Sequence, residues 1–194
     1  MSLKVTFDLA DADLEHFRLI MREARDVAKD KPRDEILASA EALLVEVRGA
    51  QVPDFVSIRL ERIQLLVDML RDEEWKLPAE ESTRVLNALA YFSEPEDLIP
   101  DHVPGLGFLD DAIMVELVNR ELRHEIEAYR DFCDYRTAEE SRRSQLGKPI
   151  DEVTKEEFLA SRRAALHARI RNRRSRERQR RRRSGGRSPF SLLP

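Results

Sequence analysis

Apolar residues recur every three or four positions through most of the chain, which is the spacing of one face of an α-helix. Proline, glycine or polar clusters separate successive stretches of this kind. The spacing predicts five helices, at about 11–28, 32–49, 53–70, 80–92 and 109–135. Only Leu3 to Leu9 alternates with a period of two, and no second such run exists to pair with it. This segment is expected to lie along helices or to pair with another copy.

A sixth helix is predicted to begin near Lys155. Thr154 and Glu157 have the spacing of a capping box, in which each side chain satisfies a backbone N–H group at a helix start. Phe158, Leu166 and Ile170 would let its first half dock weakly. After Ile170 no aliphatic or aromatic residue larger than alanine occurs before Phe190. The second half therefore has nothing to bury, and is predicted to be a solvated helix, a disordered segment or one that orders on a partner.

Charge divides the chain into two opposed parts. Residues 162–187 contain 13 arginines and one acidic residue, a net charge of +12. Subtracting this from the total of −4 leaves −16 on the remainder. We expect an all-α protein: a compact bundle of about five helices with a structured Pro/Gly loop, and a long basic C-terminal helix or disordered tail. The expected divisions are an acidic body at 1–146, a linker at 147–153, a basic helix or arm at 154–184, and a flexible C-terminus at 185–194.

The chain has one cysteine, Cys133, so it can form neither an intramolecular disulfide nor a multi-cysteine zinc site. Cys133 falls on an apolar stripe and is expected to be a small buried hydrophobe. The first twenty residues lack the basic start and apolar run of a secretory signal. No apolar stretch approaches the roughly 18 residues needed to span a bilayer. A cytoplasmic protein without a transmembrane segment is expected.

Three prolines and two glycines between Glu94 and Gly107 predict a structured loop, because prolines are costly in a helix interior. The run Ser93-Glu94-Pro95-Glu96-Asp97-Leu98-Ile99-Pro100-Asp101, followed by a hydrophobic and glycine stretch and Asp110-Asp111, resembles the core signature of the bacterial YkvA-like family. It departs from that signature in Glu94, which stands between serine and proline. The resemblance covers about 80–122 and implies a small helical domain of unknown function, without an established reaction, cofactor or catalytic residue.

The acidic residues of this loop allow two interpretations. Asp97, Asp101, Asp110 and Asp111 could accept hydrogen bonds from backbone N–H groups at turns and at the next helix start. Together with His102 they could instead bind Mg²⁺, Mn²⁺ or Ca²⁺, which would make the protein a small metal-dependent enzyme. Their spacing matches no standard ligand loop. Helix and turn capping is the favoured interpretation.

Other catalytic patterns are weak. Glu121 and His124 have the Glu-x-x-His spacing of a di-iron site, but it occurs once, and Asp13 with His16 gives only an aspartate version. Surface ion pairing is favoured for both. The sequence contains no phosphate loop, no dinucleotide-binding glycine motif, no nucleophile elbow and no His-Glu-x-x-His motif. It therefore predicts no catalytic residue and no cofactor.

The arginine segment is the stronger functional signal, because guanidinium groups match phosphate in charge and geometry. A non-enzymatic binding or adaptor protein that contacts RNA, a ribonucleoprotein or another polyanion is expected, without sequence specificity, since no aromatic residue interleaves the run. The alternatives are a tail without a ligand, attachment to anionic lipid, and folding back on the acidic body. The end from Phe190 to Leu193 could dock on another protein. The predicted nucleic-acid-binding residues are Arg169, Arg171, Arg173, Arg174, Arg176, Arg178, Arg180, Arg181, Arg182 and Arg183.

Overall fold

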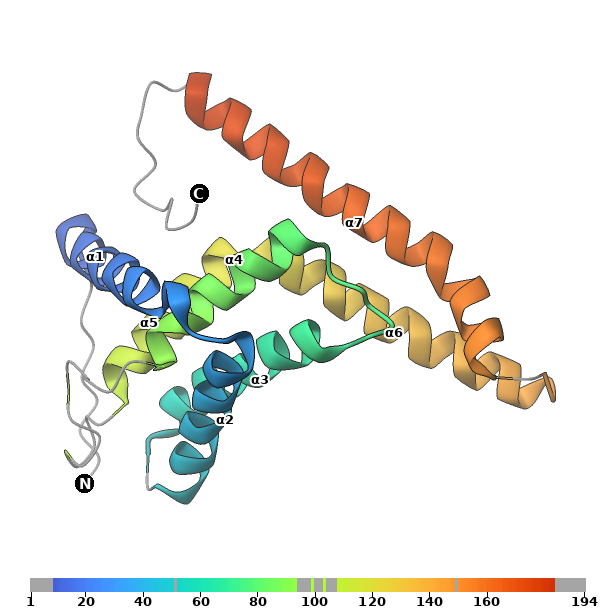
Figure 1. The fold of residues 1–194 in the computed structure, drawn as a ribbon, viewed down its shortest axis with the longest axis horizontal. Helices are drawn as coiled ribbons and strands as arrows, with labels where there is room; N and C mark the ends of the chain where they lie inside the picture. The colour runs from blue at the N-terminus through green and yellow to red at the C-terminus, as the bar shows by residue number, and fades with distance from the viewer. Residues whose placement is uncertain are drawn as a thin grey trace.

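Seven α-helices, two 3₁₀ helices and no strand are formed by the described residues of this computed structural model, namely 9–50, 52–93, 99, 103, 108–148 and 150–183 (Figure 1). The side chains of residues 11, 29 and 181 also lie outside this description. The expected extended segment, Leu3 to Leu9, falls almost wholly on residues that are not described. The elements are α1 (Asp11–Val27), η1 (Ala28–Asp30), α2 (Arg33–Gly49), α3 (Asp54–Arg71), α4 (Ala79–Leu89), η2 (Ala90–Ser93), α5 (Leu109–Glu121), α6 (Arg123–Gln145) and α7 (Glu152–Arg183).

Helices α2, α3 and α4 each begin directly after a proline. The φ angles of Pro32, Pro53 and Pro78 lie between −58° and −60°, the value that the proline ring imposes. Each proline carbonyl accepts a hydrogen bond from the first turn of its helix, at 2.8–3.0 Å. These prolines therefore start helices without a side-chain cap, and the sequence predicts their positions to within a residue or two.

The helices pack around one continuous apolar core, which confirms the all-helical prediction. Its members come from α1 to α7 and from the turns between them, and the fully buried ones lie mainly on α3, α4 and α5. The core includes Leu37, Ala40, Leu60, Ile63, Leu66, Val85, Leu89, Met114, Val118 and Phe132.

The single helix expected at 109–135 is two helices. It breaks at Leu122, whose φ of −97° and ψ of 15° lie outside helical geometry, so α5 ends at Glu121 and α6 starts at Arg123. Leu122 is fully buried. Neither glycine nor proline marks the break, and the apolar period continues across it, so the sequence carries no local signal for it.

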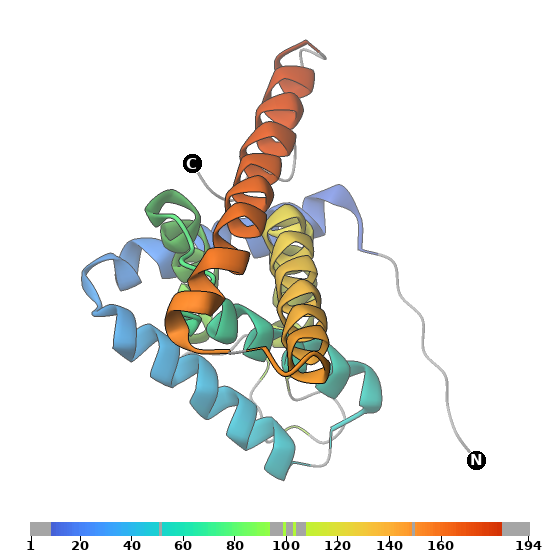
Figure 2. The same ribbon diagram turned by 90° about the vertical axis from the view of Figure 1, so that its right-hand side faces the viewer.

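Helix α7 turns back along α6 and completes the core (Figures 1 and 2). Phe158, Leu159, Leu166 and Ile170 are all buried. Trp75, on the connection between α3 and α4, is fully buried beside them, and its ring lies 4.4 Å from that of His167 on α7. The first half of α7 therefore belongs to the folded body and is more than weakly docked.

The start of α7 also differs from the expected capping box. The helix begins at Glu152, within the expected linker. The Asp151 carboxylate accepts a 2.8 Å hydrogen bond from the backbone N–H of Thr154, so aspartate caps the helix and Thr154 lies inside its first turn. This bond to the charged carboxylate lowers the pKa of Asp151.

Replacing Leu166 with alanine tests whether α7 is part of the core. We expect Leu166→Ala to lower the free energy of unfolding by about 2–4 kcal/mol, the usual effect of truncating a buried leucine. Urea denaturation followed by the emission of Trp75, the chain's one tryptophan, measures it. Val153→Ala is the control, because Val153 lies exposed on the same helix and should change stability by no more than about 0.5 kcal/mol. Equal effects of the two substitutions would contradict this packing.

Candidate nucleic-acid interface

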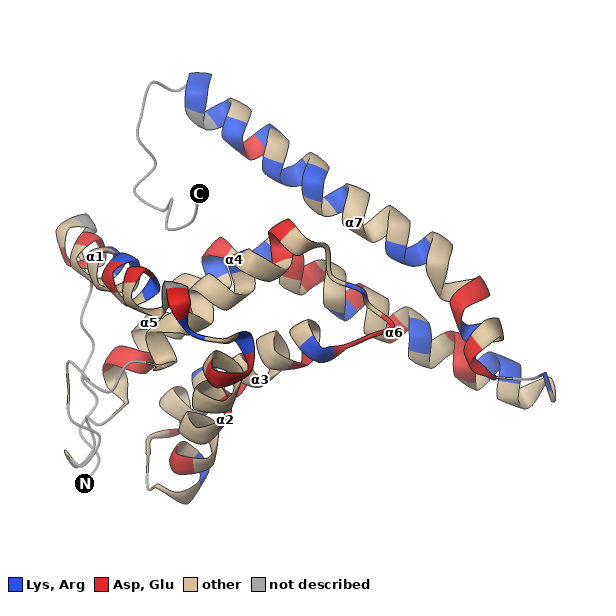
Figure 3. Ribbon diagram, viewed as in Figure 1, with Lys and Arg blue, Asp and Glu red and all other residues tan. Residues whose placement is uncertain are grey.

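Ion pairs join α7 to α6 along one side of the antiparallel pair. As residue numbers rise along α7 they fall along α6, and four of the ion pairs that join the two helices follow this order. In Figure 3 the ribbon of the second half of α7 carries the colour of basic residues on successive turns. From the loop between α6 and α7 toward the C-terminal end of α7, the pairs are Lys155 with Glu140 (2.7 Å), Arg169 with Asp131 (2.6 Å), Arg173 with Glu127, and Arg123 with Glu177 (3.0 Å).

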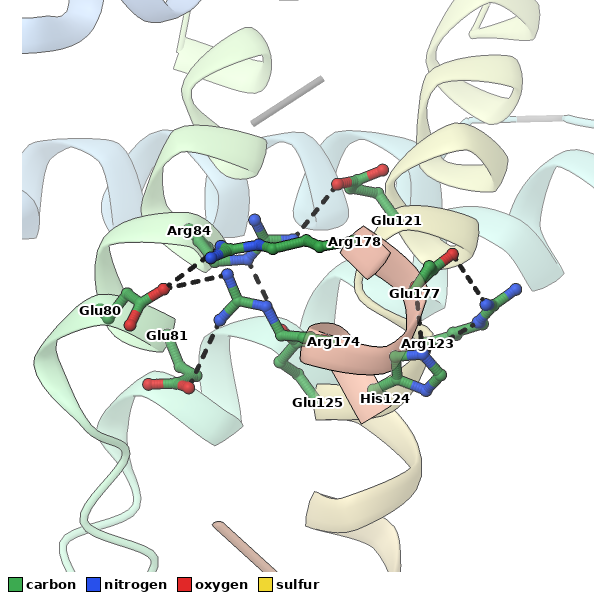
Figure 4. Close-up of polar contacts among 10 residues, drawn as sticks. All are labelled: Glu80, Glu81, Arg84, Glu121, Arg123, His124, Glu125, Arg174, Glu177 and Arg178. Carbon is green, nitrogen blue, oxygen red and sulfur yellow. Dashed lines mark hydrogen bonds and ion pairs between the residues drawn. The ribbon is translucent and has the colours of Figure 1, made fainter. Parts of the chain in front are cut away.

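Arg174 lies at the centre of a buried charge cluster between α4, α6 and α7 (Figure 4). Its guanidinium nitrogens lie 3.1 Å from the Glu80 carboxylate, 3.4 Å from that of Glu81 and 3.8 Å from that of Glu125. Arg174 retains only 8% of its exposure, and Glu81 and Glu125 are buried with it. Arg178, one turn further on, reaches Glu80 at 3.5 Å.

Arg84 of α4 extends this cluster. Its guanidinium lies 3.2 Å from the Glu121 carboxylate and 3.6 Å from that of Glu125. Burial raises the pKa of Glu125, and the positive charges of Arg84 and Arg174 oppose that shift. Arg84 and Arg174 are the two arginines that pair with Glu125. The cluster keeps Glu81 and Glu125 out of water beside these two cations.

The arginine segment thus differs from the solvated one that the sequence predicts. Four of its ten candidate arginines, at 169, 173, 174 and 178, pair with carboxylates of α4 and α6. The physical reason is that acidic residues of the body stand opposite them at matching helical spacing. A helix without large apolar residues can still be held against a neighbour by charge.

A second set, here called the outer arginines, faces solvent. They are exposed and make no ion pair with any residue that the structure describes. Arg176, Arg180 and Arg183 are separated by four and three residues, so they share one face of the helix. The last turns of α7 extend beyond the other helices in both views (Figures 1 and 2). The outer arginines are Arg171, Arg176, Arg180, Arg182 and Arg183, while the side chain of Arg181 is outside the described set.

The acidic loop is described only in part. Asp97, Asp101 and His102 lie outside the described residues, as does most of the Pro/Gly loop. Asp110 and Asp111 are both buried, and the Asp110 carboxylate accepts a 3.1 Å hydrogen bond from the backbone N–H of Ile99. Within the described ranges, no group of three or more histidine, cysteine or acidic side chains is placed to hold a metal ion.

Asp110 therefore ties the loop to α5. The sequence predicts that Asp110 or Asp111 caps the start of this helix; its N-cap is instead Phe108, which makes no side-chain cap. Phe108 adopts a left-handed backbone conformation, with φ of 62°. Such a conformation is costly for a residue with a side chain, and burial of the Phe108 ring helps to hold it.

The remaining motif residues make structural contacts. Glu121 pairs with Arg84, and His124 Nε2 lies 3.3 Å from the Glu177 carboxylate. Both side chains of the Glu-x-x-His motif contact charged residues, and they are nearly buried instead of lying on the surface as expected. Cys133 is half-buried and free, and burial raises the pKa of its thiol. No helix in the described ranges is long and apolar enough to cross a membrane.

Comparison with known proteins identifies one similarity. The model of a family described as a protein of unknown function (DUF1232) matches residues 83–117. This match covers the end of α4, η2, the loop and most of α5, a small part of the chain. No curated protein and no solved structure matches the chain. Arg84 and Asp110 fall within the matched segment, and both hold helices or loop together.

His167 makes the docking of α7 dependent on pH. Burial and the nearby charges of Arg163 and Arg171 lower its pKa to about 4, from 6.5. The docked helix therefore holds His167 neutral, and the stabilisation is complete above about pH 6.5 and is lost as the pH falls toward 4. We expect Trp75 emission in urea to show weaker docking at pH 5 than at pH 7. His167→Gln should remove this difference between pH 5 and pH 7. An NMR titration of His167 with a midpoint near 6.5 would contradict the lowered pKa.

Loss of the buried Arg174 side chain should lower the free energy of unfolding far more than loss of an outer arginine. We expect Arg174→Ala to lower the free energy of unfolding by about 3–5 kcal/mol, because it leaves buried carboxylates without their partner. Arg176→Ala, two positions away on the exposed side, should change it by no more than about 0.5 kcal/mol. Urea denaturation of both variants measures the contrast. Similar stabilities would show that Arg174 is not a buried partner of the body.

Proposed function

We propose that this chain is a non-enzymatic binding or adaptor protein of the cytoplasm, and that its basic C-terminal helix binds RNA or another polyanion without sequence specificity. The observation that carries this proposal is the set of outer arginines, which are exposed and unpaired among the described residues. We further propose that 80–122 is a YkvA-like segment whose part is structural.

Guanidinium chemistry supports a phosphate-rich partner. Each guanidinium offers several donors in a planar fork that fits phosphate oxygens, and arginine also stacks on unpaired bases. Arg176, Arg180 and Arg183 give one face of the helix three such groups over about two turns. Because no aromatic side chain accompanies them, contacts would fall mainly on the phosphate backbone.

The charge of the rest of the chain favours a confined contact. It carries −16 outside residues 162–187, so a polyanion would be repelled from most of the body and held at the basic helix. Membrane attachment is a weaker candidate, because the outer face lacks large apolar side chains to enter a bilayer. The possible docking peptide from Phe190 to Leu193 lies outside the described residues and stays a prediction.

Substitution at the outer face is the sharpest test. Cutting the chain after Leu159 would remove Leu166 and Ile170 from the core, so it would unfold part of the body as well. We expect the triple variant Arg176→Gln, Arg180→Gln, Arg183→Gln to bind a short single-stranded RNA more weakly. Its plot of log affinity against log salt should also be shallower by up to about two, since each phosphate contact contributes roughly 0.7.

A matched control removes three positive charges elsewhere. Arg48, Arg130 and Lys148 are exposed and lie outside the basic helix, without an ion pair in the described part of the chain. Their glutamine variant should lose little RNA affinity and keep the original salt slope. Fluorescence anisotropy over about 50–200 mM salt measures both properties. Equal losses in the two triple variants would mean that the outer face is not the binding surface.

A further inference from the structure

Three carboxylates at the edge of the α7 interface are accessible to solvent and yet occupied by arginines of the basic helix. They are Glu80, Glu127 and Asp131, here called the rim carboxylates, and their side chains keep 64%, 54% and 42% of their exposure. They pair with arginines that come from the same segment as the outer arginines. The pairs of Arg178 with Glu80, Arg173 with Glu127 and Arg169 with Asp131 stand in water. Glu80 also lies 3.1 Å from buried Arg174, which pairs with buried Glu81 and Glu125 as well.

We infer that the rim carboxylates act as an internal competitor for the polyanion, occupying part of the arginine surface until phosphate displaces them. This inference rests on the proposed function and adds a regulation of the same surface. A carboxylate and a phosphate oxygen present the same kind of acceptor to a guanidinium. The guanidinium donors that are directed at a rim carboxylate are not available to an external phosphate.

The arrangement suggests an order of events. The outer arginines at the end of α7 are open and make the first contact. Extending the contact along the helix then requires Arg173, Arg169 and Arg178 to leave Glu127, Asp131 and Glu80. Exposed ion pairs add little stability because water competes for both partners, so an incoming phosphate can replace them. The buried contacts of Leu166, Ile170 and Arg174 keep the helix docked throughout.

Through this competition the rim carboxylates control the affinity for the polyanion, although they do not contact it. When two acceptors compete for the same donors, weakening the internal pairs strengthens external binding, at most by the factor by which those pairs had weakened it. Removing the rim charge should therefore tighten binding and recruit more phosphates. Acidic residues elsewhere on the body act only at a distance, where salt screens them beyond a Debye length of about 10 Å at 0.1 M.

The test uses the full chain with a short single-stranded RNA of mixed sequence. The rim variant combines Glu80→Gln, Glu127→Gln and Asp131→Asn. The control variant combines Glu23→Gln, Glu46→Gln and Glu61→Gln, which removes the same charge from exposed positions of α1, α2 and α3. Trp75 emission should match wild type in both variants, because Arg174 keeps Glu81 and Glu125 as partners when Glu80 is replaced, and the apolar contacts of α7 are untouched.

We expect the rim variant to bind RNA about fivefold to tenfold more tightly than wild type, as the release of three exposed pairs allows. Its salt slope should steepen by up to about two. The control should gain no more than about twofold and keep its slope. A rim variant that matches the control, while wild type binds RNA, would overturn the competition alone. Absence of RNA binding by wild type and by both variants would overturn the proposed function as well.

Discussion

Opposite charges brought into contact out of water govern how α7 sits on the molecule. Arg174 is buried with Glu81 and Glu125 and also pairs with the exposed Glu80, and burying such groups is costly unless every charge has a partner. The net gain in stability from such a cluster is small, but the penalty for misplacing one member is large. It thus fixes the rotation of α7 about its axis: with Arg174 turned inward, Arg169 and Arg173 face α6 and the outer arginines face solvent.

Much of the fold could be predicted from local patterns. The prolines at 32, 53 and 78 restrict the backbone where helices start, and the apolar stripes between them give the helix faces. The break at Leu122 could not be predicted, because it arises from packing and no local residue signals it. The sequence favours Thr154 as the cap of α7, but Asp151, three residues earlier, has an equally good acceptor. Local sequence signals do not decide which of two candidate cap residues three positions apart starts the helix.

The candidate site also depends on packing between helices that local sequence patterns do not show. Composition identifies the arginines, but their division into paired and exposed sets depends on a neighbouring helix. A signal did exist: Glu127 and Asp131 stand four apart on one helix, as do Arg169 and Arg173 on the other. Two such rows of opposite sign can join an antiparallel pair of helices. A search for apolar residues alone treats the second half of α7 as having nothing to bury, which overlooks attachment by charge.

Because α7 is one uninterrupted helix, the number of residues between two positions decides whether both face the body or one faces solvent. Inserting or deleting one residue between Ile170 and Arg174 would turn everything beyond it by about 100°, exchanging inward and outward positions together. An insertion or deletion inside the helix would therefore break the contacts between α7 and the body, whereas lengthening or shortening the helix beyond Arg178 would preserve them. The attachment of α7 therefore restricts the spacing of its inner turns and places no restriction on the length of its far end.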